Sequence, residues 1–242
     1  MIFLFTDFGT NDLYAGQLNA AIAKIEPSII IIDLFHNAPQ FDVFSSSILL
    51  KSLLNGIPEN SIILGVVDPG VGSEQRKPIV LKTRSHIFVG PDNGLFDFVC
   101  STDETSEVYE ITWRPESLSN SFHARDLFAP IAGLIHEGES LGKLGKPFIK
   151  KPIETEEQSL NRIIYIDSFG NCFTGLNLSL LSIGQSILCE NQLIAYASVF
   201  SEVAVGELFW YENSIGLIEI AANQASAQKI LDLKVGNVFT IK

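Results

Sequence analysis

The sequence predicts an α/β fold in which an N-terminal domain with a mostly parallel central sheet precedes a smaller C-terminal β-barrel. In the first part of the chain, apolar runs alternate with segments of helical spacing, which is typical of βαβ units. In the last part, short apolar segments follow one another closely, which is typical of a small barrel or sandwich. Between residues 143 and 160, a stretch rich in Lys, Gly, Pro and then Glu has the composition of a linker. The predicted domains are therefore residues 1–150 and 160–242.

The N-terminal domain opens with alternating strands and helices. Three apolar runs predict strands at residues 2–5, 29–34 and 62–67. Between the first two, apolar side chains recur at helical spacing from Tyr14 to Ile25, and Pro27 ends that helix. Asp42 is a candidate N-cap for a second helix over 43–54. This order predicts parallel strands joined by helical crossovers.

The rest of this domain continues with shorter elements. Two strands joined by a short turn, a short helix and a further strand are expected at residues 79–82, 86–89, 95–99 and 108–112. Asp126 is predicted to cap a helix over 127–136. His123 would then lie just outside the positive end of that helix, and Arg125 and Asp126 would be structural.

The C-terminal domain is predicted from its strands alone. They are expected at residues 163–166, 186–189, 193–196, 216–220 and 238–241. Polar loops between them, including residues 221–227, are the places in this domain where a ligand would be sought.

Composition limits the classes of function. The formal net charge of −12 and the absence of a Lys/Arg block argue against nucleic-acid binding. Cys100, Cys172 and Cys189 are widely spaced and form no CxxC pair, so they indicate neither a disulfide framework nor a zinc site. The N-terminus lacks the basic segment of a signal peptide, and no apolar run approaches the length of a membrane span. We expect a cytoplasmic protein that does not bind membranes.

The segment at residues 67–72 (VDPGVG) is the first candidate site. It directly follows a predicted strand, where open α/β sheets place their ligands. Arg76 is close enough in sequence to fold back toward Asp68. An ion pair with a purely structural role is the alternative for these two residues.

A second acidic turn follows the first predicted strand. Asp7 and Asp12 flank Gly9 there, and such carboxylates suit a ribose diol or an ammonium group, although helix capping is an alternative for Asp12. The turn lacks the glycines of the GxGxxG fingerprint, which argues against a nicotinamide or flavin enzyme. Asp33 and His36 are candidates for a metal site with Asp7, although such a His is more often structural.

Six motifs in a fixed order resemble one family over nearly the whole chain. They are residues 6–9 (TDFG) with Asp12, 67–72 with Arg76, 91–94 (PDNG), 122–126 (FHARD), 167–171 (DSFGN), and 213–214 (NS) followed by 222–223 (AN). Together they resemble the S-adenosyl-L-methionine (SAM) hydroxide adenosyltransferases, relatives of the SAM-dependent fluorinase and chlorinase. The resemblance implies hydrolysis of SAM to adenosine and methionine without a cofactor or metal. It also implies a homotrimer that binds SAM between the N-domain of one subunit and the C-domain of its neighbour.

The resemblance also assigns site residues by position. The catalytic set would be Asp68, Arg76 and His123. In the substrate-binding set, Asp7 would bind the ribose and Phe41 would lie beside the sugar. Asp12, Asp167 and Ser214 would surround the methionine. Phe169, Asn171 and Asn223 would contact the adenine, and Asn213 completes the set. Three positions depart from close relatives: Ala124 replaces Gly, Ser168 a basic residue and Asn19 a Lys. Ala124 matters most, because it is next to the site of the nucleophile.

These residue types fit an attack of water at C5′ that expels neutral methionine from a sulfonium. Arg76 is always protonated, so it can stabilise a hydroxide but cannot be the base. Asp68 and His123 both remain candidates for the proton acceptor. Three other functions stay open: a halide-dependent SAM transferase, a metal phosphohydrolase built on Asp7, Asp33, His36 and Asp68, and a SAM- or adenosine-binding protein without turnover.

Overall fold

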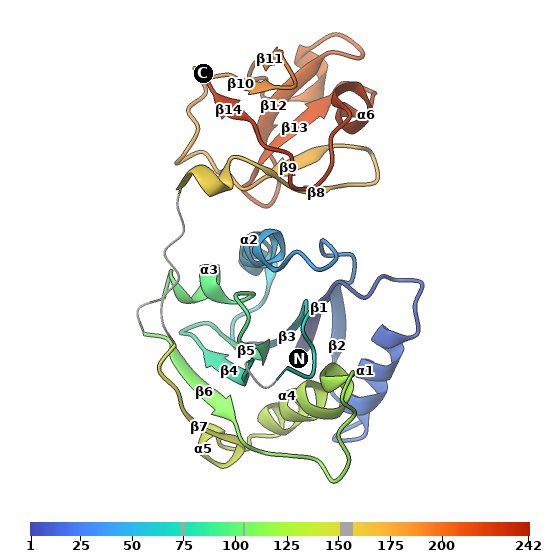
Figure 1. Ribbon diagram of the computed structural model, residues 1–242, viewed down its shortest axis with the longest axis vertical. Coiled ribbons are helices and arrows are strands. Elements are labelled where there is room, and N and C mark those ends of the chain that lie inside the picture. The colour runs from blue at the N-terminus through green and yellow to red at the C-terminus, as the bar shows by residue number, and fades with distance from the viewer. Residues whose placement is uncertain (74–75, 104, 151–156) are drawn as a thin grey trace. The chain divides into compact units, whose positions relative to one another are not determined.

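The computed structural model describes residues 1–73, 76–103, 105–150 and 157–242. The chain forms two compact units, Met1–Ile153 and Glu154–Lys242 (Figure 1). Each unit has its own hydrophobic core. Within the described ranges, no helix combines the length and the apolar character that crossing a bilayer requires.

A seven-stranded sheet with the order β2-β1-β3-β5-β4-β6-β7 forms the centre of the first unit. Its strands are β1 (Ile2–Thr6), β2 (Ile31–Phe35), β3 (Ser61–Val66), β4 (Pro78–Lys82), β5 (His86–Pro91), β6 (Glu107–Ile111) and β7 (Gly145–Pro147). The strands from β2 to β5 pair in parallel, as predicted, and the pairs from β5 to β7 are antiparallel. The sheet is therefore mixed, because the short turn between β4 and β5 can join only antiparallel strands.

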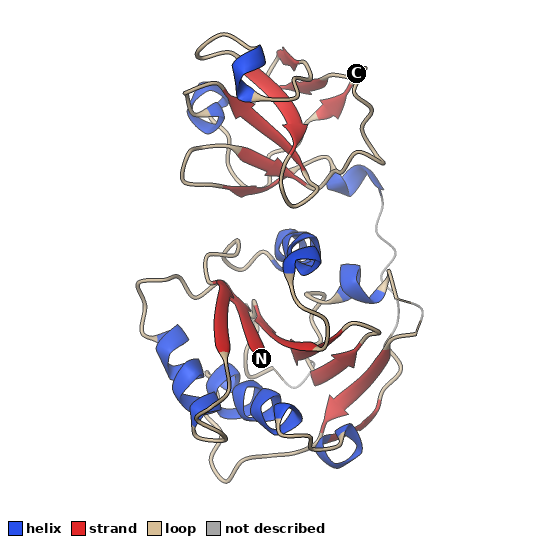
Figure 2. Ribbon diagram, turned by 180° about the vertical axis from the view of Figure 1, so that it is seen from behind, coloured by secondary structure: helices blue, strands red, loops and turns tan. Residues whose placement is uncertain are grey.

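Helices cover both faces of this sheet (Figures 1 and 2). On one face lie α1 (Tyr14–Ala23) and α4 (Ala129–His136), which share a core with β1 and β3. On the other face lie α2 (Val43–Leu53), followed by the 3-10 turn η1 (Leu54–Gly56), and α3 (Asp97–Cys100). The expected cap of α2 is confirmed, since Asp42 Oδ1 accepts a hydrogen bond from the Ser45 amide at 3.0 Å.

The predicted cap at Asp126 is wrong. The helical segment begins earlier, with the π-helical turn η2 (Ala124–Phe128), and His123 is the residue just before it. The Asp126 carboxylate instead binds the Arg125 guanidinium at 2.6 and 2.9 Å and accepts from the Ser119 amide at 2.9 Å. Because these partners occupy its oxygens, the Asp126 carboxylate stabilises the loop before the helix. This agrees with the structural role predicted for Arg125 and Asp126.

The stretch with linker composition is shorter than predicted. Residues 141–144 form the helix α5 (Leu141–Leu144), and β7 adds to the sheet edge at β6. Lys150, only 9% exposed, then pairs with Asp92 and with Asp97 at 2.8 Å. Residues up to 150 therefore belong to the first unit, while residues 151–156 of the expected linker lie outside the described part of the chain.

Two antiparallel sheets and short helices make up the second unit (Figure 2). One sheet has the order β12-β13-β9-β8, with β8 (Ile163–Ile166), β9 (Cys172–Thr174), β12 (Leu208–Glu212) and β13 (Ile218–Ala222); the other has the order β11-β10-β14, with β10 (Ile187–Cys189), β11 (Gln192–Ile194) and β14 (Thr240–Ile241). The helical segments are η3 (Glu157–Leu160), η4 (Phe200–Glu202) and α6 (Ala227–Leu231). Side chains from both sheets share one core around the fully buried Trp210. The sequence reading missed β9, β12 and α6.

Candidate active site

Asp7 and Asp68 lie at the same edge of the first unit's sheet. The strands β1 and β3 are parallel neighbours, and Thr6 pairs with Val66 at their carboxyl ends. The chain leaves both strands at this edge. Asp7 and Asp68 come just after the strands in the sequence, so they lie at this edge as well. Open α/β sheets bind their ligands at such an edge.

The Asp68 carboxylate forms an ion pair with Arg76. Nη1 of Arg76 contacts Oδ1 of Asp68, and the two side chains are only 13% and 6% exposed. The Gly70 amide donates a second hydrogen bond to the same oxygen at 3.3 Å. A Cβ at Gly70 would lie 2.7 Å from Arg76 Nη1, so the absence of a side chain leaves room for the guanidinium. The predicted pairing of Asp68 and Arg76 is therefore present.

Gly72 holds the loop after β3 against the segment that leads to His123. Its φ of +86° favours glycine, and a Cβ there would lie 2.6 Å from the Asn120 carbonyl oxygen. The close packing of these two segments brings His123 to the site of Asp68.

Burial shifts the pKa values of Asp68 and His123 in opposite directions. Burial raises the pKa of Asp68, although the charge of Arg76 opposes this shift. Burial lowers the pKa of His123, and the attraction of Asp68 opposes that shift. The two pKa values are therefore shifted toward each other, and Asp68 and His123 both remain candidates for the proton acceptor.

A pocket of about 370 Å³, here called the front pocket, opens beside this group. It is lined by five of the predicted residues: Asp7, Asp12, Phe41, Asp68 and His123. Arg76 does not line the front pocket, but it is paired with Asp68, which does. Ala124, one of the three positions that depart from close relatives, also lines the front pocket. It is 3% exposed, so its methyl group occupies space close to His123.

Phe41 adopts an unusual backbone conformation at the rim of the front pocket. Its φ is 61°, its amide donates to Asp7 Oδ2 at 3.1 Å, and its side chain is 72% exposed. A left-handed Phe is strained, and such strain is common at binding sites. The carboxylate of Asp7 thus holds Phe41 where its ring is free to cover a ligand.

Three aromatic rings that the sequence reading did not assign to the site form a wall of the front pocket. Phe8 lies 5.6 Å from Tyr14 and 6.0 Å from Phe122, and Tyr14 lies 5.4 Å from Phe122, measured between ring centroids. The signal in the sequence was that Phe8 and Phe122 are adjacent to Asp7 and His123 in the motifs, and that Tyr14 is two residues from Asp12.

The residues of the metal-site alternative have other partners. Nδ1 of the buried His36 lies 2.7 Å from Thr6 Oγ1, and its Nε2 lies 3.2 Å from Asp33. Asp68 is paired with Arg76. Within the part of the chain that the structure describes, no three His, Cys, Asp or Glu side chains gather as metal ligands would. These contacts favour the structural interpretation of His36.

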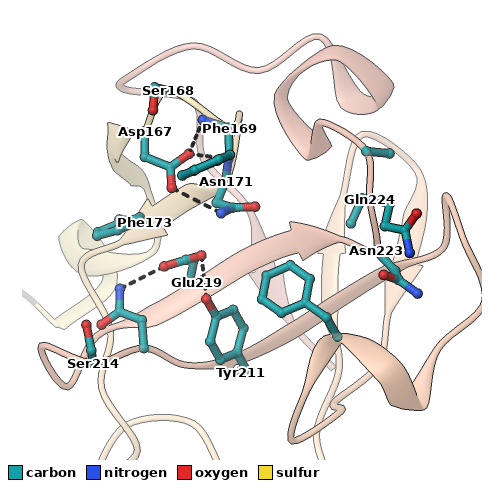
Figure 3. Close-up of a pocket in the computed structure, with 14 residues that line it drawn as sticks. Asp167, Ser168, Phe169, Asn171, Phe173, Tyr211, Ser214, Glu219, Asn223 and Gln224 are labelled. Carbon is teal, nitrogen blue, oxygen red and sulfur yellow. Dashed lines mark hydrogen bonds between the residues drawn. The ribbon is translucent and has the colours of Figure 1, made fainter.

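A larger pocket of about 1060 Å³ lies in the second unit (Figure 3). It is lined by the six remaining predicted residues: Asp167, Phe169, Asn171, Asn213, Ser214 and Asn223. The structure therefore gathers the candidate residues into two groups, one in each unit.

Asp167 organises one side of this pocket. Its Oδ1 accepts from the amides of Phe169 and Asn171 at 2.9 Å each, and its Oδ2 accepts from the Asn171 side chain at 3.0 Å (Figure 3). Gly170, with a φ of +87°, packs so closely on Ser226 that a Cβ would lie 2.0 Å from its Oγ. This tight turn leaves the Phe169 ring 78% exposed, which suits stacking on a planar ligand.

Glu219 is a further pocket residue that the sequence did not lead us to predict. It is 2% exposed, and it accepts hydrogen bonds from Tyr211 Oη at 2.7 Å and from Asn213 Nδ2 at 3.0 Å (Figure 3). Burial raises its pKa, and these two donors oppose the shift. A single Glu inside the apolar strand β13 was the available signal, because a buried carboxylate needs partners.

Asn223 and Ser214 differ in how firmly they are held. Asn223 is 9% exposed, and its Nδ2 donates to the Val203 carbonyl at 2.8 Å, which leaves its oxygen for a ligand. Ser214 is exposed at the edge of the pocket, next to Asn213 (Figure 3).

Comparisons with known proteins identify the family. Residues 2–145 match the model of the SAM hydroxide adenosyltransferase N-terminal domain, and residues 161–240 match that of the C-terminal domain. The chain belongs to the SAM hydroxide adenosyltransferase family. The resemblance seen in the motifs is thus confirmed, and it covers nearly the whole chain.

Relatives within this family carry the names of two activities. A protein of Thermus thermophilus, named (R)-S-adenosyl-L-methionine hydrolase, is 30% identical over 97% of this chain and 96% of its own length. A fluorinase of Nocardia brasiliensis is 21% identical over 100% of this chain and 96% of its own. A crystal structure of an uncharacterized conserved protein from Thermotoga maritima, 31% identical, superposes with a TM-score of 0.89 over 100% of this chain and 99% of that one.

Proposed function

We propose that this chain is an enzyme that hydrolyses SAM to adenosine and L-methionine. The observation that supports this most is the meeting of Asp68, Arg76 and His123 beside the front pocket, since this is the set that the family resemblance assigns to hydroxide transfer. The similarity to the (R)-SAM hydrolase of Thermus thermophilus extends the proposal to the sulfonium epimer, which would be the R form.

The catalytic step is a displacement at C5′. The oxygen of a water molecule forms a bond to C5′ while the C5′–S bond breaks, and its electron pair stays on sulfur, which leaves neutral methionine. The proton of the water goes to Asp68 or His123, and Arg76 stabilises the developing hydroxide. Holding water in line with the C5′–S bond supplies a large part of the rate, because well-oriented reactants gain about 7–11 kcal/mol.

The two groups of residues suit different parts of SAM. In the first unit, the Asp7 carboxylate would accept hydrogen bonds from the ribose diol, and the exposed Phe41 ring would pack over the sugar. The family resemblance assigns Phe169, Asn171 and Asn223 to adenine, and it assigns Asp12, Asp167 and Ser214 to methionine. Asn213, held by Glu219, completes the substrate-binding set.

Four finer features of the protein are part of the same proposal. The domains are residues 1–150, with the catalytic set, and residues 160–242, with the adenine and methionine contacts. The two sheets of the second unit belong to a β-barrel. The protein is a homotrimer, which light scattering would test, and it is cytoplasmic, which cell fractionation would test.

The activity is tested by incubating the purified protein separately with the R and S sulfonium epimers of SAM. Chromatography is expected to detect adenosine and methionine in equal amounts, with the R epimer consumed faster. Parallel reactions with added chloride or fluoride address the halide-dependent alternative, which requires a 5′-halo-adenosine product. Calorimetric binding of SAM without either product would select the non-catalytic alternative and end the proposal.

A further inference from the structure

A second cavity of about 320 Å³, here called the rear cavity, also reaches the catalytic group. Asp68 and His123 line it, as they line the front pocket, so these two side chains stand between the two spaces. Arg76 lines the rear cavity and is absent from the lining of the front pocket. The catalytic group therefore borders a second space, which Arg76 lines and whose other lining residues differ from those of the front pocket.

The rear cavity runs from a buried end to the protein surface. At the buried end, the Asp68 side chain is 6% exposed. At the other end, Gly72 and Arg114 are exposed residues, and the Lys77 side chain is 43% exposed. The rear cavity is therefore lined both by the buried catalytic group and by residues that solvent reaches.

The lining of the rear cavity is suited to water. Lys77 pairs with Glu110 at 3.0 Å, which lowers the pKa of Glu110, so that this carboxylate stays ionised. Arg114 Nη1 donates to the carbonyls of Ile111 and Trp113 at 2.8 Å each. Charged groups of this kind hold water, and a water molecule needs only about 30 Å³, so the cavity has room for several.

We propose that the rear cavity is the route by which water reaches the catalytic group and the proton leaves it. This inference rests on the proposed hydrolysis. Each turnover consumes one water and releases one proton, and the substrate fills the front pocket during the reaction. A separate route lets the catalytic group exchange water and protons with solvent while SAM stays bound.

The proton balance of the cycle is complete along this route. The attacking water forms the O–C5′ bond of adenosine and gives one proton to Asp68 or His123. The C5′–S electron pair leaves with methionine. The accepting side chain then passes its proton to water in the rear cavity, which restores the base for the next turnover. Glu110 does not store the proton, since Lys77 holds its pKa low.

The test narrows the rear cavity at Leu118, which lines it and does not line the front pocket. Leu118→Trp, and the smaller Leu118→Phe, are compared with Leu118→Ala and with Ile149→Trp, which changes a side chain that is 91% exposed. We expect the Trp variant to lower kcat at least about 10-fold, which corresponds to about 1.4 kcal/mol, with the Kd for SAM unchanged within about 2-fold. The solvent deuterium isotope effect on kcat should rise, and both controls should stay near the wild type.

Two outcomes would overturn the route. The first is a kcat and isotope effect within about 2-fold of the wild type in a folded Leu118→Trp variant. The second is an equal loss of SAM affinity, which would mean that the substitution acts on the substrate pocket. If the Trp variant does not fold, the Phe variant decides by the same criteria. An inactive wild type contradicts the proposed hydrolysis instead, and so separates the two failures.

Discussion

The guanidinium of Arg76 contacts the carboxylate of Asp68 across Gly70, a residue whose missing side chain leaves the space for it. Arg76 cannot act as a base, whereas Asp68 can, and the pair lies beside a pocket that His123 also lines. In the mechanism proposed above, this arrangement keeps a hydroxide close while a neighbour takes its proton.

Gly70→Ala should damage this arrangement without removing a catalytic group. The added Cβ would lie 2.7 Å from Arg76 Nη1 and force the guanidinium to move. We expect kcat to fall by about 10- to 100-fold, since removal of one stabilising donor costs about 10²–10³. Gly142→Ala is the matched control, because nothing lies within 4 Å of its added Cβ. Equal kcat values in the two variants would contradict the role given to the Asp68–Arg76 pair.

Loss of either candidate base should separate binding from turnover. Asp68→Asn and His123→Gln preserve size and polarity, and we expect kcat to fall about 10²- to 10⁴-fold in the variant that lacks the true base. The Kd for SAM, measured by calorimetry, should change much less. Wild-type turnover in both variants would show that the assigned roles are wrong.

The pH dependence of kcat should identify the base. A base must be unprotonated, so activity is lost as the pH falls through its pKa. Burial lowers the pKa of His123 from about 6.5 and raises that of Asp68 from about 3.9. Wild-type kcat should therefore be level at neutral pH and decline between about pH 6.5 and pH 4.

The variants extend this pH test. If His123 is the base, the residual kcat of the His123→Gln variant should no longer decline as the pH falls from about 6.5 to 4. If Asp68 is the base, the decline should persist in His123→Gln and disappear in Asp68→Asn. A wild-type decline that begins well above pH 7 would contradict both assignments.

Glu219 should act on substrate affinity. It accepts hydrogen bonds from Tyr211 and Asn213, so it fixes two side chains that line the second unit's pocket. Hydrogen bonds to a charged group are worth about 1.5–3 kcal/mol each, so Glu219→Gln should weaken SAM binding at least about 10-fold while kcat stays within a few-fold. Tyr211→Phe removes one of the two bonds and should have the smaller effect. An unchanged Kd for SAM in the Glu219→Gln variant would contradict the role of Glu219 in substrate affinity.

Lys150 should stabilise the first unit. It is 9% exposed and neutralises Asp92 and Asp97, and these hydrogen bonds raise its pKa although burial alone would lower it. Lys150→Met leaves two carboxylates without their cation, which should cost about 3–5 kcal/mol of unfolding free energy. Chemical denaturation measures this, with Lys143→Met as the control, since its side chain is 74% exposed. Equal stability of the two variants would contradict the role of Lys150.

Local patterns in the sequence were sufficient for much of the first unit. The apolar runs gave β1 and β3, and the polar residues that follow them lie at one sheet edge because parallel neighbours end together. The pairing of Asp68 with Arg76 was also anticipated. The cap at Asp126 was not, because local pattern favours an N-cap there, whereas Arg125 and Ser119 use its carboxylate in the fold.

Features that depend on distant contacts escaped the sequence reading. The strands β9 and β12 were missed, although they pair with β13, the strand that holds Glu219. The rear cavity involves β4, β5, β6 and η2, which only the folded chain brings together. Assignment of a role to Phe41, Asn171 or Asn223 came from the family resemblance, since no spacing along the chain marks an adenine or sugar site.

The central claim is that a water molecule activated by Asp68, Arg76 and His123 attacks C5′ of SAM. Hydrolysis of SAM in water enriched in ¹⁸O, followed by mass spectrometry of both products, tests it most directly. One ¹⁸O atom in the 5′-hydroxyl of adenosine, with none in methionine, is the predicted result. Adenosine without the label, or no adenosine from either sulfonium epimer, would contradict the account.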